Sequence, residues 1–96
     1  YRAGYSTHVF HQYTLEIKNG KRDALKQWVD DNKIPNMIYY PVPLYKQKAF
    51  SEYVPDNFRL DNTELLCDSV ISLPIHTEMI AEQLSYISEK VKAFFK

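Results

Sequence analysis

Hydrophobic and polar residues alternate in the first part of the chain, between His8 and Ile17. One set of alternate positions holds Val9, His11, Tyr13, Leu15 and Ile17, and the other holds Phe10, Gln12, Thr14 and Glu16. This period of two predicts a β-strand with one buried face. The following Asn19-Gly20 is a turn signal.

Two segments instead show the three- and four-residue spacing of amphipathic helices. The first is Asp23–Asp31, in which Leu25, Trp28 and Val29 recur at helical spacing. Ile34-Pro35 ends it, because proline lacks an amide donor and disfavours helix in the residue before it. The second is Met79–Phe95, and it has the clearest apolar stripe in the chain: Ile80, Leu84, Ile87, Val91 and Phe94 or Phe95.

Shorter elements are expected between these two helices. Asn36–Tyr40 is rich in strand formers and stops at a proline, and Ser69–Leu73 is a further apolar run before Pro74, so both are predicted strands. Asn62–Cys67 is predicted to form a brief helix with Asn62 as its N-cap.

The connection from Pro41 to about Leu60 shows neither period clearly, although Lys46–Tyr53 has room for a turn or two of helix. Long connections of this kind are commonly functional or disordered, and both possibilities stay open.

These elements predict an α+β fold, in which a small three-stranded sheet is flanked by helices. Ninety-six residues suit one core, so residues 1–96 are expected to form a single domain.

Composition narrows the possible partners. Twelve basic residues balance twelve acidic ones, so no overall field attracts nucleic acid or an anionic membrane. A single cysteine cannot form an internal disulfide, and no apolar run approaches the roughly 20 residues of a membrane-spanning helix. We therefore expect a cytoplasmic protein.

Two features indicate that the chain is part of something larger. It begins Tyr1-Arg2-Ala3-Gly4 rather than with Met, as expected of a fragment. Eight tyrosines and five phenylalanines exceed what a small core can hide, so some rings are expected to cover another surface.

Few residues offer chemistry of their own. Gly4 and Gly20 are the only glycines, and neither lies in a phosphate-binding loop. His8 and His11 fall on opposite faces of the predicted strand, and Cys67 and His76 lack companions at metal-ligand spacing, so no metal site is expected. A Cys-His nucleophile pair stays open, although packing is the more common role of a lone cysteine.

The best local candidate for a polar site is formed by His11, Tyr39 and Tyr40. Their side chains can hydrogen-bond to a sugar hydroxyl while the rings pack against its apolar face. The alternative is that all three are ordinary sheet, core and surface residues.

Several segments, in order and over nearly the whole chain, resemble the C-terminal domain of the DegT/DnrJ/EryC1/StrS aminotransferases. They are His8-Val9-Phe10-His11-Gln12-Tyr13, Arg22-Asp23-Ala24-Leu25, Ile34-Pro35, Tyr39-Tyr40-Pro41-Val42-Pro43-Leu44 with Gln47 and Phe50, Ser72-Leu73-Pro74-Ile75-His76, and Glu82-Gln83-Leu84. Any one is a weak signal, but their order and close spacing make the set specific.

The resemblance implies the small domain of a fold-type I enzyme whose large domain binds pyridoxal phosphate through a lysine. Such enzymes move an amino group, usually from glutamate, onto a nucleotide-linked keto-sugar, at active sites formed between the two subunits of a homodimer. It also implies that His11, Tyr39 and Tyr40 border the sugar and position it. Lys33, Lys46 and Lys48 lie in polar stretches and are not expected to replace the cofactor lysine, so this chain alone is expected to be inactive.

Three positions depart from the family pattern. Tyr45 stands where many members have histidine, so a polar contact near the presumed site is expected to be altered or lost. Lys33 replaces a usual glycine, which indicates that Asn32 or a different turn ends the first helix. Ile80 replaces a usual Ser or Thr cap, so Thr77 is the expected cap of the last helix.

Two other functions stay open. The chain can be a stand-alone α+β binding or dimerisation module, or part of a pyridoxal- or pyridoxamine-phosphate-dependent sugar dehydratase of the same family. The sequence that precedes this chain in the genome would discriminate between them.

Overall fold

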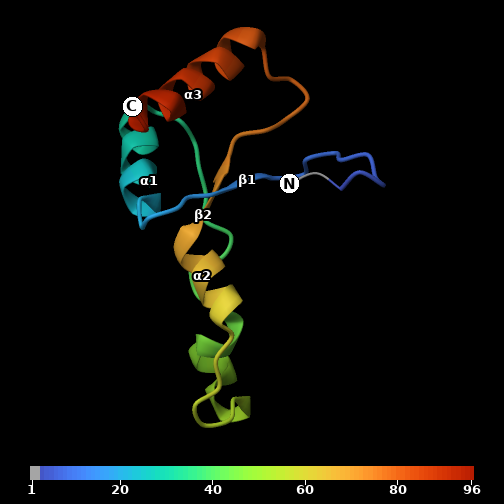
Figure 1. Ribbon diagram of the computed structural model, residues 1–96, viewed down its shortest axis with the longest axis vertical. Helices are drawn as coiled ribbons and strands as arrows, with labels where there is room; N and C mark the ends of the chain where they lie inside the picture. Colours follow the sequence, from blue (N-terminus) through green and yellow to red (C-terminus); the bar gives the residue numbers. More distant parts are fainter. Residues whose placement is uncertain (1–2) are drawn as a thin grey trace.

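The computed structural model describes residues 3–96. Tyr1 and Arg2, on which the expectation of a fragment partly rests, lie outside the described residues. The elements in chain order are β1 (Tyr13–Glu16), α1 (Arg22–Asp31), the short 3₁₀ helices η1 (Leu44–Lys46) and η2 (Lys48–Tyr53), α2 (Asp61–Ser69), β2 (Val70–Leu73) and α3 (Ala81–Phe94). The architecture is α+β, as predicted (Figure 1). Within the described range, no helix is long and apolar enough to cross a membrane.

β1 and β2 form an antiparallel pair at the middle of the molecule (Figure 1). β1 is shorter than the predicted strand His8–Ile17. The extended backbone is interrupted at Phe10, whose φ of 48° lies in the left-handed region, and the ladder with β2 begins only at Tyr13. The register pairs Tyr13 with Leu73.

The predicted second strand, Asn36–Tyr40, is wrong as a strand, because it is reduced to one bridge between Met37 and Ser72. The Met37 amide donates to the Ser72 carbonyl at 3.1 Å, and the Ser72 amide donates to the Met37 carbonyl at 2.7 Å. The next antiparallel pair on one side would join Pro35 to Pro74, and neither proline has an N–H to donate.

Strand pairing is also blocked on the other side of this bridge. The next pair there would need Val70, but its amide already donates to the Leu66 carbonyl at the end of α2. Its carbonyl accepts a hydrogen bond from Arg22 at 3.2 Å. The sheet among the described residues is therefore two-stranded, with one bridge added to β2.

α1 and α3 pack together over one part of this sheet. The buried core consists of Ile17, Leu25, Val29, Ile34 and Ile71, with Leu15, Ile87, Val91 and Phe94 packed against it. Both predicted amphipathic helices are confirmed, with α3 starting two residues later than expected. Trp28 Nε1 donates to the Lys90 carbonyl at 3.0 Å, and Tyr86 Oη donates to the Asn32 carbonyl at 2.9 Å, so polar bonds also join the helices.

The end of α1 shows how Lys33 takes the place of a glycine. Asn32 is the C-cap, as predicted, and Lys33 follows with a left-handed φ of 58°. The amide of Lys33 donates to the Asp30 carbonyl and that of Ile34 to the Val29 carbonyl, each at 2.9 Å. These two bonds form a Schellman motif, which normally places glycine at the left-handed position.

Two predicted N-caps are wrong. α2 begins at Asp61 after Leu60, so Asn62 lies inside the first turn. α3 begins after Ile80, and Thr77 lies in the preceding turn. Gln83 Oε1 accepts the Ile80 amide at 3.1 Å, which is half of a capping box, but the Ile80 side chain has no oxygen to complete it.

Residues 41–69, here called the arm, extend away from the core on the opposite side of the sheet from α1 and α3 (Figure 1). η1, η2 and α2 lie within it, and η2 confirms the helical turns expected within Lys46–Tyr53. The chain as a whole measures 50 × 35 × 23 Å, and its radius of gyration is 16.2 Å. A compact domain of this length has a radius of gyration of about 13 Å, so the arm makes the molecule distinctly elongated.

Candidate functional site

His11 and Tyr39 line one open groove of about 300 Å³. The groove lies where the chain enters β1, between residues 35–39 and the end of β2. Gln12, Asn36 and Ser72 also line it. The structure therefore brings two of the three predicted site residues to one place, together with three polar residues that the sequence analysis did not select.

Tyr40 belongs to a different groove. This second groove, of about 280 Å³, is lined largely by apolar residues of the arm, with Gln47 as a polar neighbour. Tyr39 lines both grooves, and its ring meets that of Tyr40 edge-on with centroids 5.9 Å apart. Tyr40 is 73% exposed. Tyr39 thus forms a shared wall, whereas His11 and Tyr40 are not brought together.

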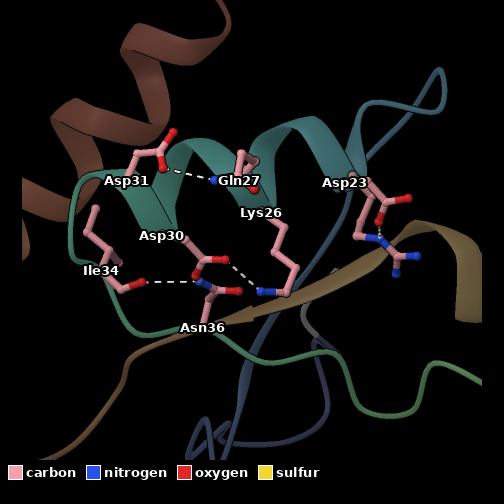
Figure 2. A network of polar contacts seen from close by, with 8 residues as sticks. Asp23, Lys26, Gln27, Asp30, Asp31, Ile34 and Asn36 are labelled. Carbon is pink, nitrogen blue, oxygen red and sulfur yellow. Dashed lines mark hydrogen bonds and ion pairs between the residues drawn. The ribbon is translucent and has the colours of Figure 1, made fainter.

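Asn36 lines the first groove and is hydrogen-bonded to Asp30 of α1 (Figure 2). Its Nδ2 donates to Asp30 Oδ1 at 2.6 Å and to the Ile34 carbonyl at 3.1 Å. The other oxygen of Asp30 accepts from Lys26 at 2.7 Å. The hydrogen bond from Lys26, followed by that from Asn36, lowers the pKa of Asp30. These bonds hold the segment leading to Tyr39 against a rigid helix.

Ser72 joins the three strand-like segments around the groove. Its side-chain oxygen lies 2.8 Å from that of Thr14 on β1, and its backbone pairs with Met37. Ser72 is only 6% exposed. A serine within the apolar run Val70–Leu73 was the available sequence signal for this role, because a buried hydroxyl must find a partner.

Tyr45 lines neither of these two grooves. Its hydroxyl donates to Glu64 Oε1, and its ring packs edge-on against Phe58 with centroids 5.2 Å apart. Tyr45 therefore makes its polar contact within the arm. The sequence predicts an altered or lost polar contact at this position, and the Tyr45 hydroxyl bonds to Glu64, outside the first two grooves.

Glu64 is the centre of this polar network. Besides Tyr45, it pairs with Lys46 Nζ at 2.8 Å and with Arg59 Nη2 at 3.6 Å. The hydrogen bond from Lys46, then that from Tyr45, lowers the pKa of Glu64, and the same bond raises the pKa of Lys46. Partial burial, then the bond to Glu64, raises the pKa of Tyr45.

Lys46 does not suit the role of the lysine that holds pyridoxal phosphate. A lysine that binds the cofactor covalently needs a depressed pKa, whereas the ion pair with Glu64 raises the pKa of Lys46. Both glycines lack the setting of a phosphate-binding loop. No group of three or more His, Cys, Asp or Glu side chains in residues 3–96 is arranged to hold a metal ion.

The first groove combines an imidazole, a phenol and amides with apolar neighbours, which suits a hydroxylated ligand with an apolar face. An open groove of this kind can bind and orient such a ligand.

Comparison with known proteins identifies the family to which this chain is similar. The family model of the DegT/DnrJ/EryC1/StrS aminotransferases matches residues 2–92. The chain is 37% identical over 89 residues to a pleiotropic regulatory protein of Geobacillus stearothermophilus, covering 93% of this chain. It is 32% identical over 87 residues to the dTDP-3-amino-3,6-dideoxy-alpha-D-galactopyranose transaminase of Aneurinibacillus thermoaerophilus, covering 91% of this chain.

A third relative, a UDP-N-acetyl-3-dehydro-alpha-D-glucosamine 3-aminotransferase of Acidithiobacillus ferrooxidans, is 36% identical over 94% of this chain. The chain spans only 23% of the length of each of these three relatives.

Two solved structures share the fold. One is DesV of S. venezuelae in complex with a ketimine intermediate, with a TM-score of 0.86 and 26% identity over 96% of this chain and 24% of that chain. The other is an aminotransferase of Brucella abortus, with a TM-score of 0.76 and 32% identity over 86% of this chain and 22% of that chain.

Proposed function

The chain belongs to the DegT/DnrJ/EryC1/StrS aminotransferase family, and on this basis we propose that it is the C-terminal small domain of a pyridoxal-phosphate-dependent sugar aminotransferase. The complete enzyme would move an amino group, with glutamate as the expected donor, onto a nucleotide-linked keto-sugar in the cytoplasm. The cofactor and its lysine would belong to the preceding part of the polypeptide, and the enzyme would be a homodimer.

The observation that carries this proposal is the family match over residues 2–92. Two of the relatives are named as a transaminase and an aminotransferase of dTDP- and UDP-linked sugars, which supports a nucleotide-linked substrate. The length of the relatives supports a larger whole, since about three-quarters of each lies outside the matched region.

Within the complete enzyme, His11 and Tyr39 would position the sugar. Their shared groove supports this role, because both side chains can hydrogen-bond to hydroxyl groups while their rings cover apolar C–H faces. Tyr40 would act from the second groove, on a different part of the substrate. Asn36 and Ser72 would hold the walls of the first groove in place through their bonds to α1 and β1.

The test is to express the longer protein that contains this chain and to incubate it with pyridoxal phosphate, glutamate and dTDP- or UDP-linked 3-keto-sugars. Mass spectrometry should detect the amino sugar, and 2-oxoglutarate should form in equal amount. The 96-residue chain under the same conditions should form neither. Amino transfer by the 96-residue chain alone, or none by a longer protein that binds the cofactor, would contradict the proposal.

A regulatory role is the second candidate function, because one relative is named as a pleiotropic regulatory protein. A longer protein whose large domain lacks the cofactor lysine would favour this role over amino transfer. A sugar dehydratase is discriminated by the same assay, because it would release water from the sugar without consuming glutamate.

A further inference from the structure

A third groove, on the arm, is lined almost entirely by apolar side chains. Its volume is about 470 Å³, and its walls include Leu44, Phe50, Tyr53, Phe58 and Leu60. Leu44 is 61% exposed and Tyr53 is 80% exposed. Within the whole arm, only Pro43, Cys67 and Ser69 are buried. The arm therefore has almost no core of its own and presents its apolar residues to the outside.

The total accessible surface of the chain is larger than that of a compact protein of the same mass. The accessible surface is 7883 Å² for a mass of 11.4 kDa. A compact monomer of that mass exposes roughly 5,800 Å². The excess, about 2,000 Å², exceeds the roughly 800 Å² that each partner buries in a standard interface. The excess belongs to the whole chain, and the arm, in which only three residues are buried, contributes to it.

Glu64 connects the segments of the arm that form the groove. This carboxylate binds Tyr45 and Lys46 on η1 and Arg59 on the loop before α2, so three parts of the arm meet at one residue. Tyr45 also lines the groove and packs against Phe58. A surface that is ordered before association loses less conformational entropy on docking, which favours binding.

We propose that this arm groove is a docking surface for the preceding part of the same longer polypeptide, and that it fastens the small domain to the cofactor-binding domain. The inference rests on the proposed function. The length of chain outside this structure decides the occupant, because the matched relatives are about four times as long as the segment matched here. A domain of that size in the same molecule is present at high effective concentration, which favours it over a second copy.

Tyr53 provides a sharp test because it is 80% exposed in this chain. If nothing covers the groove, Tyr53→Asp leaves hydrogen exchange in the arm unchanged. If the preceding domain covers it, the substitution places an unpaired charge in a buried interface. Leu44→Asp is a second variant on the same groove. Tyr5→Asp is the matched control, because Tyr5 is 91% exposed and lies outside the arm.

Amide hydrogen exchange of residues 44–60 is the measurement, made on the longer protein and on the 96-residue chain. We expect these amides to exchange at least tenfold more slowly in the longer protein. Tyr53→Asp and Leu44→Asp should remove most of that protection, whereas Tyr5→Asp should leave it intact. Equal exchange in the two proteins, or equal effects of the three variants, would overturn the docking surface.

Sedimentation of the same variants separates the possible occupants. If Tyr53→Asp exposes the arm only by splitting a dimer, and dilution of the unaltered protein does the same, a second copy covers the groove and the proposal is wrong. Amino transfer is assayed separately. An active enzyme with an unprotected arm contradicts only the docking surface, and a protected arm without amino transfer contradicts only the proposed function.

Discussion

Arg22 Nη1 donates a hydrogen bond of 2.8 Å to the carbonyl oxygen of Cys67, 45 residues further along the chain. Arg22 opens α1 and Cys67 lies in the last turn of α2, so the guanidinium supplies a donor and a positive charge to the C-terminal end of another helix. The same nitrogen reaches the Val70 carbonyl at 3.2 Å. With only 8% of Arg22 exposed, this side chain connects the arm to the core.

Replacing Arg22 should therefore be costly. Arg22→Ala leaves two carbonyl oxygens without their charged donor, and we expect a loss of about 3 kcal/mol in the free energy of unfolding. Urea denaturation followed by circular dichroism measures it. Lys21→Ala, at the exposed neighbouring residue, should stay within about 0.5 kcal/mol of the unaltered chain. Similar losses of unfolding free energy for both variants would show that the hydrogen bonds of the buried guanidinium do not stabilise the fold.

Lys33→Gly should stabilise the chain. Lys33 holds a left-handed φ of 58° in the Schellman motif, and a side chain with a Cβ costs about 1 kcal/mol or more in that conformation. We expect a gain of about 1 kcal/mol in the same denaturation assay. Lys33→Ala is the control, because it removes the charge but keeps the Cβ. A gain of equal size for alanine would trace the effect to charge instead of backbone strain.

Ile80→Ser should also stabilise the chain, by completing the capping box of α3. Gln83 already accepts the Ile80 amide, and a serine oxygen at position 80 can accept the amide of Gln83 in return. An N-cap of this kind contributes about 1 kcal/mol, seen as a higher midpoint of thermal unfolding. Ile80→Ala removes the apolar side chain without supplying an acceptor. It should show no gain, and a gain would contradict the capping explanation.

Stability should fall in acid because of Glu64. Its pKa is lower in the folded chain than the ordinary value of 4.5, so the stabilisation that Lys46 and Tyr45 supply is complete above that pH. It is lost as the pH falls from about 4.5 through the lower, folded pKa. Urea midpoints measured from pH 7 to pH 3 should decline less steeply for Glu64→Gln than for the unaltered chain.

Glu52→Gln, at an exposed residue of η2, is the control and should retain the steep decline. At the alkaline end, the raised pKa values of Tyr45 and Lys46 have the opposite effect. Their contribution is present below pH 10 and is lost as the pH rises through the folded values. If the urea midpoint of Glu64→Gln falls in acid as steeply as that of the unaltered chain, other carboxylates cause the loss of stability.

In the longer enzyme, His11→Ala and Tyr39→Phe should each raise the KM for the keto-sugar nucleotide about tenfold, the effect of losing one hydrogen bond worth about 1.4 kcal/mol. Their effect on cofactor binding should be small. His8→Ala is the matched control, since His8 is exposed and does not line the groove. Unchanged kinetics for both variants would remove these residues from the site.

The candidate site could be predicted from the sequence only in part. His11 and Tyr39 have the side chains expected at a sugar site, and the structure places them in one groove. Tyr40 has the same chemistry and follows directly in the chain, yet it lines the second groove. Asn36 was missed because its importance lies in a bond to Asp30, and nothing in the local pattern indicates that pairing.

Local patterns by themselves determined the helices α1 and α3, the run that became β2 and the α+β class, because each depends on spacing within a few residues. The tertiary structure alone decided how far the sheet extends. Asn36–Tyr40 has the composition of a strand, but pairing beyond its one bridge to β2 would need Pro74, which follows β2 and lacks a donor, and Val70, whose polar groups are bound by α2 and Arg22. Strand pairing needs free donors and acceptors on two segments at once, so one segment's sequence could not determine it.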